Sequence, residues 1–107
     1  MRAKFYCPFG ITNVWGHPPV NGEERMKNGK KAMHLNQKPL KLTRLIIEIS
    51  SEKNDVIWEP FGGLCTGAIA ALELDRKCDA AEITNSVFQQ AIERVETLVR
   101  KPKLNLQ

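Results

Sequence analysis

Residues 55–67 read DVIWEPFGGLCTG, and this stretch decides the fold. The β-branched, apolar run at 55–58 predicts a short buried strand that Glu59 closes. The glycine pair at 62 and 63 predicts a tight turn, and the small, mostly apolar residues 66–74 predict a helix packed against a sheet. Ligands of parallel α/β sheets lie at the carboxyl ends of the strands. The acid and the glycine turn therefore mark a candidate ligand site.

The residues that follow predict a second strand and a long helix. Residues 78–83 (CDAAEI) indicate a strand that ends near Glu82. Residues 85–99 indicate an amphipathic helix, which Thr84 or Asn85 can cap. Its apolar face would consist of Phe88, Ala91, Ile92, Val95, Leu98 and Val99. Strand, helix and strand in close succession predict a parallel βαβ unit with a right-handed crossover.

A further helix is predicted upstream of this unit. Pro39 suits a helix start, and residues 40–51 place Leu42, Leu45, Ile46 and Ile49 on one face. Residues 1–39 are rich in proline and glycine and predict irregular structure. We expect residues 40–107 to form an α/β half-domain. We also expect Trp15 and Trp58 to lie in the core rather than to stack on bases.

The composition indicates a globular chain with a mildly basic balance. Its 107 residues carry a net charge of +4, which favours an anionic partner such as nucleic acid. The charged segment 21–34 predicts either a solvated surface loop or a phosphate-contacting loop. The candidate nucleic-acid contacts are Arg25, Lys27, Lys30 and Lys31.

Three cysteines without a Cys-x-x-Cys pair, and two scattered histidines, predict neither a disulfide framework nor a metal site. This cysteine usage fits a reducing cytoplasm. No apolar run is long enough to span a bilayer, so we expect no membrane association.

The glycine turn departs from two common phosphate-binding motifs. Leu64 stands where the dinucleotide fingerprint needs its third glycine, and Ala68 stands where a phosphate loop needs lysine after Gly67. Glu82 follows Glu59 at about the 20-residue spacing that brings an acid onto a ribose in dinucleotide folds. One carboxylate can accept from both vicinal hydroxyls. The pattern favours a nucleoside without phosphates, such as S-adenosylmethionine.

Residues 34–82 resemble the C-terminal half of the β-class amino-methyltransferases of DNA, which methylate the exocyclic nitrogen of adenine or cytosine. His34–Pro39 (HLNQKP) is similar to the family's His-Pro-x-Gln-Lys-Pro, and Glu59–Thr66 (EPFGGLCT) is similar to its Asp-Pro-Phe-x-Gly-Ser-Gly-Thr. Further matches are TNVW at 12–15, Arg76, Glu82, Ala91 and Arg94. The resemblance implies a partial Rossmann-like, S-adenosylmethionine-dependent methyltransferase fold.

The resemblance also implies roles for individual residues. Glu59, with the backbone of Phe61 and Gly63, would hold the amino end of the methionine moiety. Glu82 would take the ribose hydroxyls, and Phe61 or Ile83 would pack on the adenine. Gln37, Lys38 and Thr66 would lie near the methionine carboxylate. The predicted cofactor-binding residues are Gln37, Lys38, Glu59, Pro60, Phe61, Gly63, Thr66, Glu82 and Ile83.

The sequence departs from the family pattern at three loop positions. Glu59 replaces aspartate, Leu64 replaces serine, and Cys65 replaces glycine. A positive φ at Cys65 would cost about 1 kcal/mol relative to glycine. These departures put cofactor affinity in question.

The family's catalytic motif, a Pro-Pro pair followed by an aromatic residue, has no match in this chain. The only Pro-Pro pair stands between His17 and Val20 and indicates a turn, so no catalytic residue is predicted. We therefore expect an S-adenosylmethionine-binding subunit or fragment of a site-specific DNA methyltransferase of the restriction–modification type, inactive alone. Adenine N6 is the favoured target. Its partner would be a second polypeptide with the catalytic half, or a second copy of the chain. The alternative is a catalytically dead DNA-binding or assembly module.

Overall fold

The computed structural model describes residues 14–16, 27–28, 31–32 and 37–101. Two short strands, β1 (Lys27–Asn28) and β2 (Lys31–Ala32), pair in an antiparallel manner. The remaining elements, in chain order, are α1 (Leu40–Ser50), β3 (Val56–Glu59), α2 (Thr66–Glu73), β4 (Lys77–Ala80) and α3 (Asn85–Arg100).

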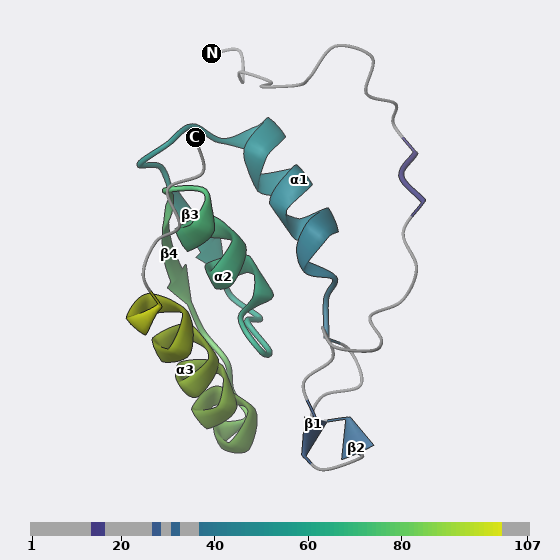
Figure 1. Cartoon of the computed structure of the whole chain (residues 1–107), viewed down its shortest axis with the longest axis vertical. Helices are drawn as coiled ribbons and strands as arrows, with labels where there is room; N and C mark the ends of the chain where they lie inside the picture. Colours follow the sequence, from purple (N-terminus) through teal and green to yellow (C-terminus); the bar gives the residue numbers. More distant parts are fainter. Residues whose placement is uncertain (1–13, 17–26, 29–30, 33–36, 102–107) are drawn as a thin grey trace.

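Strands β3 and β4 form the parallel pair that the sequence predicts, with α2 as the crossover between them (Figure 1). The register sets Val56 opposite Lys77 and Glu59 opposite Ala80. The predicted βαβ unit with a preceding helix is confirmed. One detail was wrong: β4 ends at Ala80, so Glu82 lies in the loop beyond the strand rather than at its tip.

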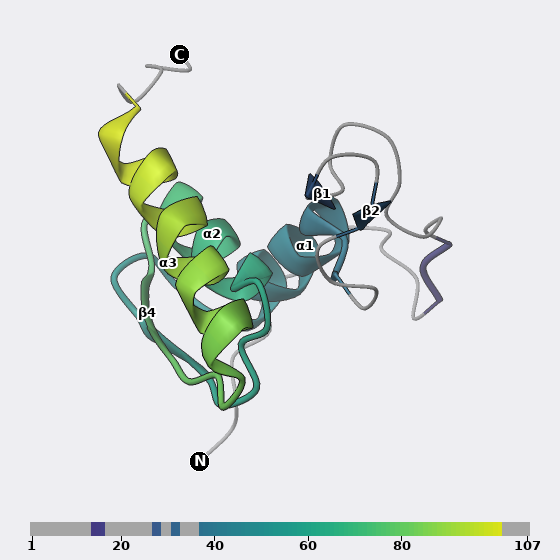
Figure 2. The same cartoon turned by 90° about the horizontal axis from the view of Figure 1, so that it is seen from below.

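The core lies between the sheet and two helices. Ile47 of α1 packs with Ala70 and Ala71 of α2, and Ile57 and Cys78 of the strands pack against this cluster. The alanines have no exposed surface, which lets α2 approach both neighbours closely. Leu40 and Leu74 complete the cluster. Figures 1 and 2 show α1 and α2 side by side on the same side of the sheet.

The predicted apolar face of α1 was wrong at one residue. Ile47 is buried, whereas Ile46 is about half exposed. The periodicity alone could not distinguish them, because it is the contact with α2 that selects the buried residue. Ile49 is buried as predicted.

The opposite face of the sheet is exposed. Side chains alternate along a strand, so Ile57 points to the core while Val56 and Trp58 point away from it. Val56 is 60% exposed and Trp58 is 62% exposed. The expectation that Trp58 and Trp15 lie in the core was therefore wrong; Trp15 is also exposed. Within residues 37–101, the helices that meet the strands cover only one face.

Helix α3 forms as predicted, but its apolar face is only partly covered. Ala91 is the one buried residue of α3, and Phe88, Ile92 and Val99 are exposed. The described elements beside it provide no further strand on which this face could pack. No helix in the described part of the chain is long and apolar enough to cross a membrane.

Arg76 joins the two turns that flank the sheet. It is buried and donates to Ser51 Oγ (3.0 Å), to the Ser51 carbonyl (2.7 Å) and to the Leu74 carbonyl (2.7 Å). The turn after α1 is thereby fixed to the turn after α2, at the end of the sheet away from the glycine loop.

Candidate functional site

The glycine loop continues the parallel ladder beyond the ends of the strands. The Gly62 amide donates to the Ala81 carbonyl (2.7 Å), and the Ala81 amide donates to the Glu59 carbonyl (3.0 Å). A Cβ at Gly62 would lie 3.1 Å from both the Ala81 oxygen and Cys65 Sγ, so the loop fits closely over β4.

Two residues of the loop adopt the left-handed conformation. Gly63 does so freely, with a φ of 55°. Cys65, at the N-cap of α2, also has a φ of 55°, where the family pattern has glycine. Its left-handed conformation costs about 1 kcal/mol, which the surrounding contacts must offset.

Glu59 turns its carboxylate beneath the start of α2. Its side chain is 11% exposed, and Oε2 accepts from the Ala68 amide at 3.2 Å. The N-cap residue Cys65 makes no side-chain capping bond, so Glu59 supplies the anion at the positive end of the helix. Lys38 Nζ lies 3.9 Å from its Oε1. Glu59 therefore holds the helix start and Lys38 together.

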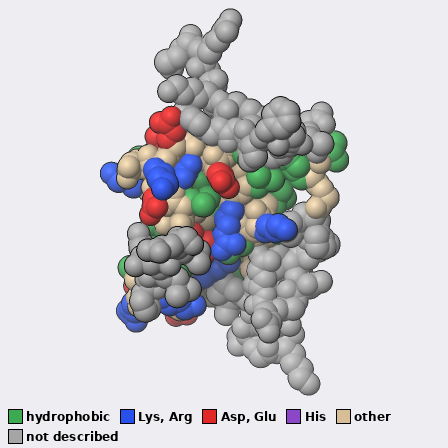
Figure 3. Space-filling model, turned by 45° about the horizontal axis from the view of Figure 1, so that its top comes forward, with side chains coloured by type: hydrophobic (Ala, Val, Ile, Leu, Met, Phe, Trp, Pro, Cys, Tyr) green, Lys and Arg blue, Asp and Glu red, His purple; other side chains and the backbone are tan. Residues whose placement is uncertain are grey.

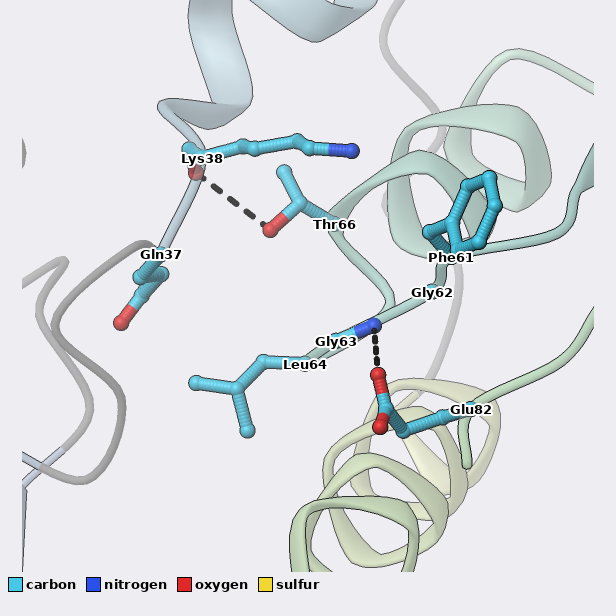
Figure 4. Close-up of a pocket in the computed structure, with 8 residues that line it drawn as sticks. All are labelled: Gln37, Lys38, Phe61, Gly62, Gly63, Leu64, Thr66 and Glu82. Atoms are coloured by element: carbon cyan, nitrogen blue, oxygen red, sulfur yellow. Dashed lines mark hydrogen bonds between the residues drawn. The ribbon is translucent and has the colours of Figure 1, made fainter. Parts of the chain in front are cut away.

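Glu82 ties the glycine loop to the start of α3. Its Oε1 accepts from the Gly63 amide (3.0 Å), and its Oε2 accepts from the Thr84 amide (2.7 Å). Thr84 is the N-cap of α3 but makes no side-chain capping bond. Figure 4 shows the Glu82 carboxylate directed at the loop from below. Glu82 thus joins the glycine loop to the residue that precedes the first turn of α3, and the side-chain cap predicted for Thr84 is not formed.

These segments line one open cavity of about 290 Å³ (Figure 4). It lies between the approach to α1, the glycine loop and the loop after β4. Its lining residues are Gln37, Lys38, Phe61, Gly62, Gly63, Leu64, Thr66 and Glu82.

Six of the nine predicted cofactor-binding residues line this cavity: Gln37, Lys38, Phe61, Gly63, Thr66 and Glu82. The other three do not. Glu59 lies behind the loop, and Pro60 and Ile83 are exposed outside the cavity. Gly62 and Leu64 also line the cavity, although neither was predicted to bind the cofactor. In sequence, Leu64 stands out only as a departure from the third glycine of the dinucleotide fingerprint and from the family's serine, whereas in the structure its aliphatic side chain is 3% exposed and lines the cavity.

A hydrogen-bonded chain joins three segments of the site. Thr66 Oγ1 donates to the Lys38 carbonyl (3.3 Å) and accepts from Arg94 Nη1 (2.9 Å). The same nitrogen of Arg94 donates to the Leu64 carbonyl (2.9 Å). Arg94 matches the family pattern, but its partners lie about 30 positions away in the chain, so no local signal in the sequence predicts these bonds.

The two thiols beside the loop are poor nucleophiles. Burial, reinforced by the Glu59 carboxylate, raises the pKa of Cys65, although the Arg94 guanidinium opposes this shift. Burial and the same carboxylate raise the pKa of Cys78 to about 11. Because the thiolate is the reactive form, both side chains act as small packing groups at neutral pH.

The side chains of the four predicted nucleic-acid contacts lie outside the part of the chain that the structure describes. Arg25 and Lys30 lie outside the described residues, and only the backbone of Lys27 and Lys31 is described, in β1 and β2. On the face drawn in Figure 3, the Lys and Arg side chains of the described residues are interspersed with acidic ones. The described side chains on that face therefore form no single-sign patch.

The chain is similar in sequence to known DNA methyltransferases. A family model for N6_N4_Mtase, described as DNA methylase, matches residues 9–93. The chain belongs to this family. Among curated DNA methylases, it is 32% identical over 71 residues to the type II methyltransferase M.HindIII of Haemophilus influenzae, covering 66% of the chain and 23% of that protein. It is 35% identical over 92 residues to M.HinfI of the same species, covering 84% of the chain and 25% of that protein.

A third relative is the DNA adenine methyltransferase YhdJ of Escherichia coli K12. It is 31% identical over 84 residues, which cover 78% of the chain and 27% of YhdJ. The chain thus spans about a quarter of the length of these curated relatives.

Two solved structures that contain S-adenosylmethionine share the fold. The M1.HpyAVI–SAM complex superposes with a TM-score of 0.66 at 28% identity, over 86% of this chain and 43% of that one. TTHA0409 of Thermus thermophilus, a putative DNA modification methylase complexed with S-adenosyl-L-methionine, gives 0.57 at 31% identity, over 61% of this chain and 27% of that one. The predicted methyltransferase fold is confirmed.

Proposed function

We propose that the chain binds S-adenosylmethionine in the 290 Å³ cavity, as the cofactor-binding part of a DNA amino-methyltransferase. The observation that carries the proposal is the convergence of Gln37–Lys38, the glycine loop and Glu82 on one cavity. These segments lie far apart in sequence, and all three were predicted to hold this cofactor. Two structural neighbours were solved in complex with it.

Each wall of the cavity suits one part of the cofactor. A carboxylate offers about four lone-pair positions, so Glu82 can accept from ribose hydroxyls while it holds the loop. Phe61, 85% exposed beside the cavity, offers an aromatic face to the adenine. Lys38 offers positive charge to the methionine carboxylate. When bound, the cofactor supplies the methyl group for transfer.

Glu59 has a different role in this proposal from the one that the resemblance implies. Its carboxylate is largely buried and bound to the Ala68 amide. We place it as a support that fixes the start of α2 and draws Lys38 toward the cavity. Its contact with the methionine amino group stays a prediction.

We also propose that a second polypeptide, which carries the catalytic motif, covers the exposed face of the sheet. The described parallel sheet has two strands, and one of its faces exposes Val56 and Trp58. Parallel sheets are buried on both faces in folded α/β proteins. We further propose that the complex acts on DNA in the cytoplasm and methylates N6 of adenine. A second copy of the chain is the competing occupant of that face.

The alternative, a catalytically dead module, is favoured by one observation: Cys65 is held in a left-handed conformation that its side chain disfavours. It predicts that the chain retains the fold but binds no cofactor.

Calorimetric titration with S-adenosylmethionine tests the cofactor claim. We expect micromolar binding by the wild-type chain, loss of binding in Glu82→Ala, and unchanged binding in Glu48→Ala, an exposed glutamate on α1. Circular dichroism establishes that both variants are folded. A wild-type chain that releases no heat would refute binding by the isolated chain and favour the alternative.

A methylation assay tests the partner claim. The chain is mixed with a polypeptide that carries the family's Pro-Pro-aromatic catalytic motif, and with DNA and labelled cofactor. We expect no methylation by either polypeptide alone, methylation by the mixture, and N6-methyladenine in the nucleoside digest. Trp58→Lys should weaken the complementation. Activity of the chain alone would contradict the need for a partner.

A further inference from the structure

Arg94 reaches the glycine loop from the third helix. Ala91, one turn earlier, is buried, and its small side chain lets α3 approach the start of α2. From there a single nitrogen of Arg94 donates to the Leu64 carbonyl and to Thr66 Oγ1, both at 2.9 Å. The guanidinium does not line the cavity itself.

The two acceptors flank the strained residue. Leu64 and Thr66 are the immediate neighbours of Cys65, whose backbone is left-handed. Fixing the carbonyl before Cys65 and the side chain after it restrains the backbone rotation on both sides. Through Thr66, which donates to the Lys38 carbonyl, the restraint also reaches the opposite wall of the cavity.

We propose that Arg94 is a positioning residue that holds the loop left-handed at Cys65, and thereby keeps the walls of the cofactor cavity in place. A hydrogen bond from a charged donor is stronger than a neutral one, and its loss would leave the Leu64 carbonyl without this donor. Without the guanidinium, the loop relaxes toward conformations that a β-carbon favours. Glycine at position 65 has no such preference and depends less on Arg94. The link to the cofactor rests on the proposed function; the restraint on the loop does not.

A double-mutant cycle tests the coupling between Arg94 and Cys65. Arg94→Met is made in the wild-type chain and in Cys65→Gly, and S-adenosylmethionine affinity is measured by calorimetry. We expect a loss of at least about tenfold in the wild-type background and of no more than about threefold in Cys65→Gly. Arg94→Lys, which keeps the charge and one donor, should lie between. Arg100→Met, an exposed arginine on the same helix, is the control and should change nothing.

Amide hydrogen exchange provides a second measurement that needs no cofactor. Arg94→Met should speed exchange in residues 62–68 by about tenfold, leave α1 unchanged, and have a smaller effect with glycine at 65. Equal losses in both backgrounds would show that Arg94 merely docks α3, and would overturn the proposal. Unchanged loop exchange would overturn it as well. A chain that binds no cofactor but shows the exchange coupling would refute the proposed function and retain the restraint.

Discussion

Gly67→Ala tests how tightly Glu59 is packed beneath α2. Gly67 is the second residue of the helix and is buried. A Cβ at this position would lie 2.7 Å from Glu59 Oε2 and 2.8 Å from both Cδ and Oε1. At such distances the end of the Glu59 side chain must shift, and the cost of the shift is set by the contacts that the carboxylate gives up.

Two opposing effects set the magnitude. Alanine is favoured over glycine in a helix by about 0.5–1 kcal/mol. Against this, the bond from the Ala68 amide to a charged acceptor contributes about 1.5–3 kcal/mol, and the carboxylate's interaction with the helix dipole adds about 0.3–1 kcal/mol. The 3.2 Å length of the bond favours the lower values. We expect Gly67→Ala to lower the free energy of unfolding by about 1–2 kcal/mol.

Urea unfolding followed by circular dichroism measures this change, and Glu59→Asp provides the matched background. The shorter side chain withdraws the carboxylate by one methylene group, so Gly67→Ala should be neutral or stabilising there. A wild-type chain that tolerates Gly67→Ala without loss, or an equal loss in both backgrounds, would show that the carboxylate does not constrain position 67.

Three further predictions concern other parts of the structure. Arg76→Met should lower the free energy of unfolding by about 2–4 kcal/mol in urea melts, because Ser51 and Leu74 lose a charged donor in a buried site; a loss below about 0.5 kcal/mol would contradict this role. Gln90→Leu should raise the free energy of unfolding by about 1 kcal/mol in the same assay, since the buried Gln90 Oε1 has no hydrogen-bond partner among the described residues; a decrease would contradict it. Cys78, with its pKa raised from 9.0 to about 11, should react with iodoacetamide about 100-fold more slowly at pH 8 than an unperturbed thiol, and the rate should climb with pH up to about 11. Because folding raises this pKa, Cys78 favours the folded state below pH 9, and this contribution is lost as the pH rises toward 11. A rate plateau near pH 9, seen by mass spectrometry, would refute the shift.

The order of the elements could be predicted from sequence because each one is encoded locally. The glycine turn after Glu59 and the amphipathic period of 85–99 are both readable in short windows. The local pattern does not encode which residue of α1 contacts α2. Ile46 was therefore predicted on the apolar face, whereas Ile47 is the buried residue. Trp58 was placed in the core because an apolar run suggests burial on both faces, whereas the described sheet has helices on only one.

The site was predictable as a set of segments and less so as a set of contacts. Parallel strands explain why Glu59 and Glu82 end near one loop. The sequence could not show that the Glu59 carboxylate accepts a hydrogen bond from the Ala68 amide at the start of α2, whereas the Glu82 carboxylate accepts one from the Gly63 amide. The family pattern singled out Arg94 but not its partners, since a bond between a helix and a loop about 30 residues apart depends on how α3 packs.

The hydrogen bonds from Gly62 to Ala81 and from Gly63 to Glu82 have a consequence for ligand recognition. They shape the cavity walls during folding, so the entropy of ordering the loop is not lost again when a ligand arrives. Adenosine, which is a fragment of S-adenosylmethionine, would meet the same cavity walls as the whole cofactor. The affinity of adenosine would then reflect only the contacts of the nucleoside. Competition between adenosine and S-adenosylmethionine would therefore separate the contribution of the nucleoside contacts from that of the methionine contacts.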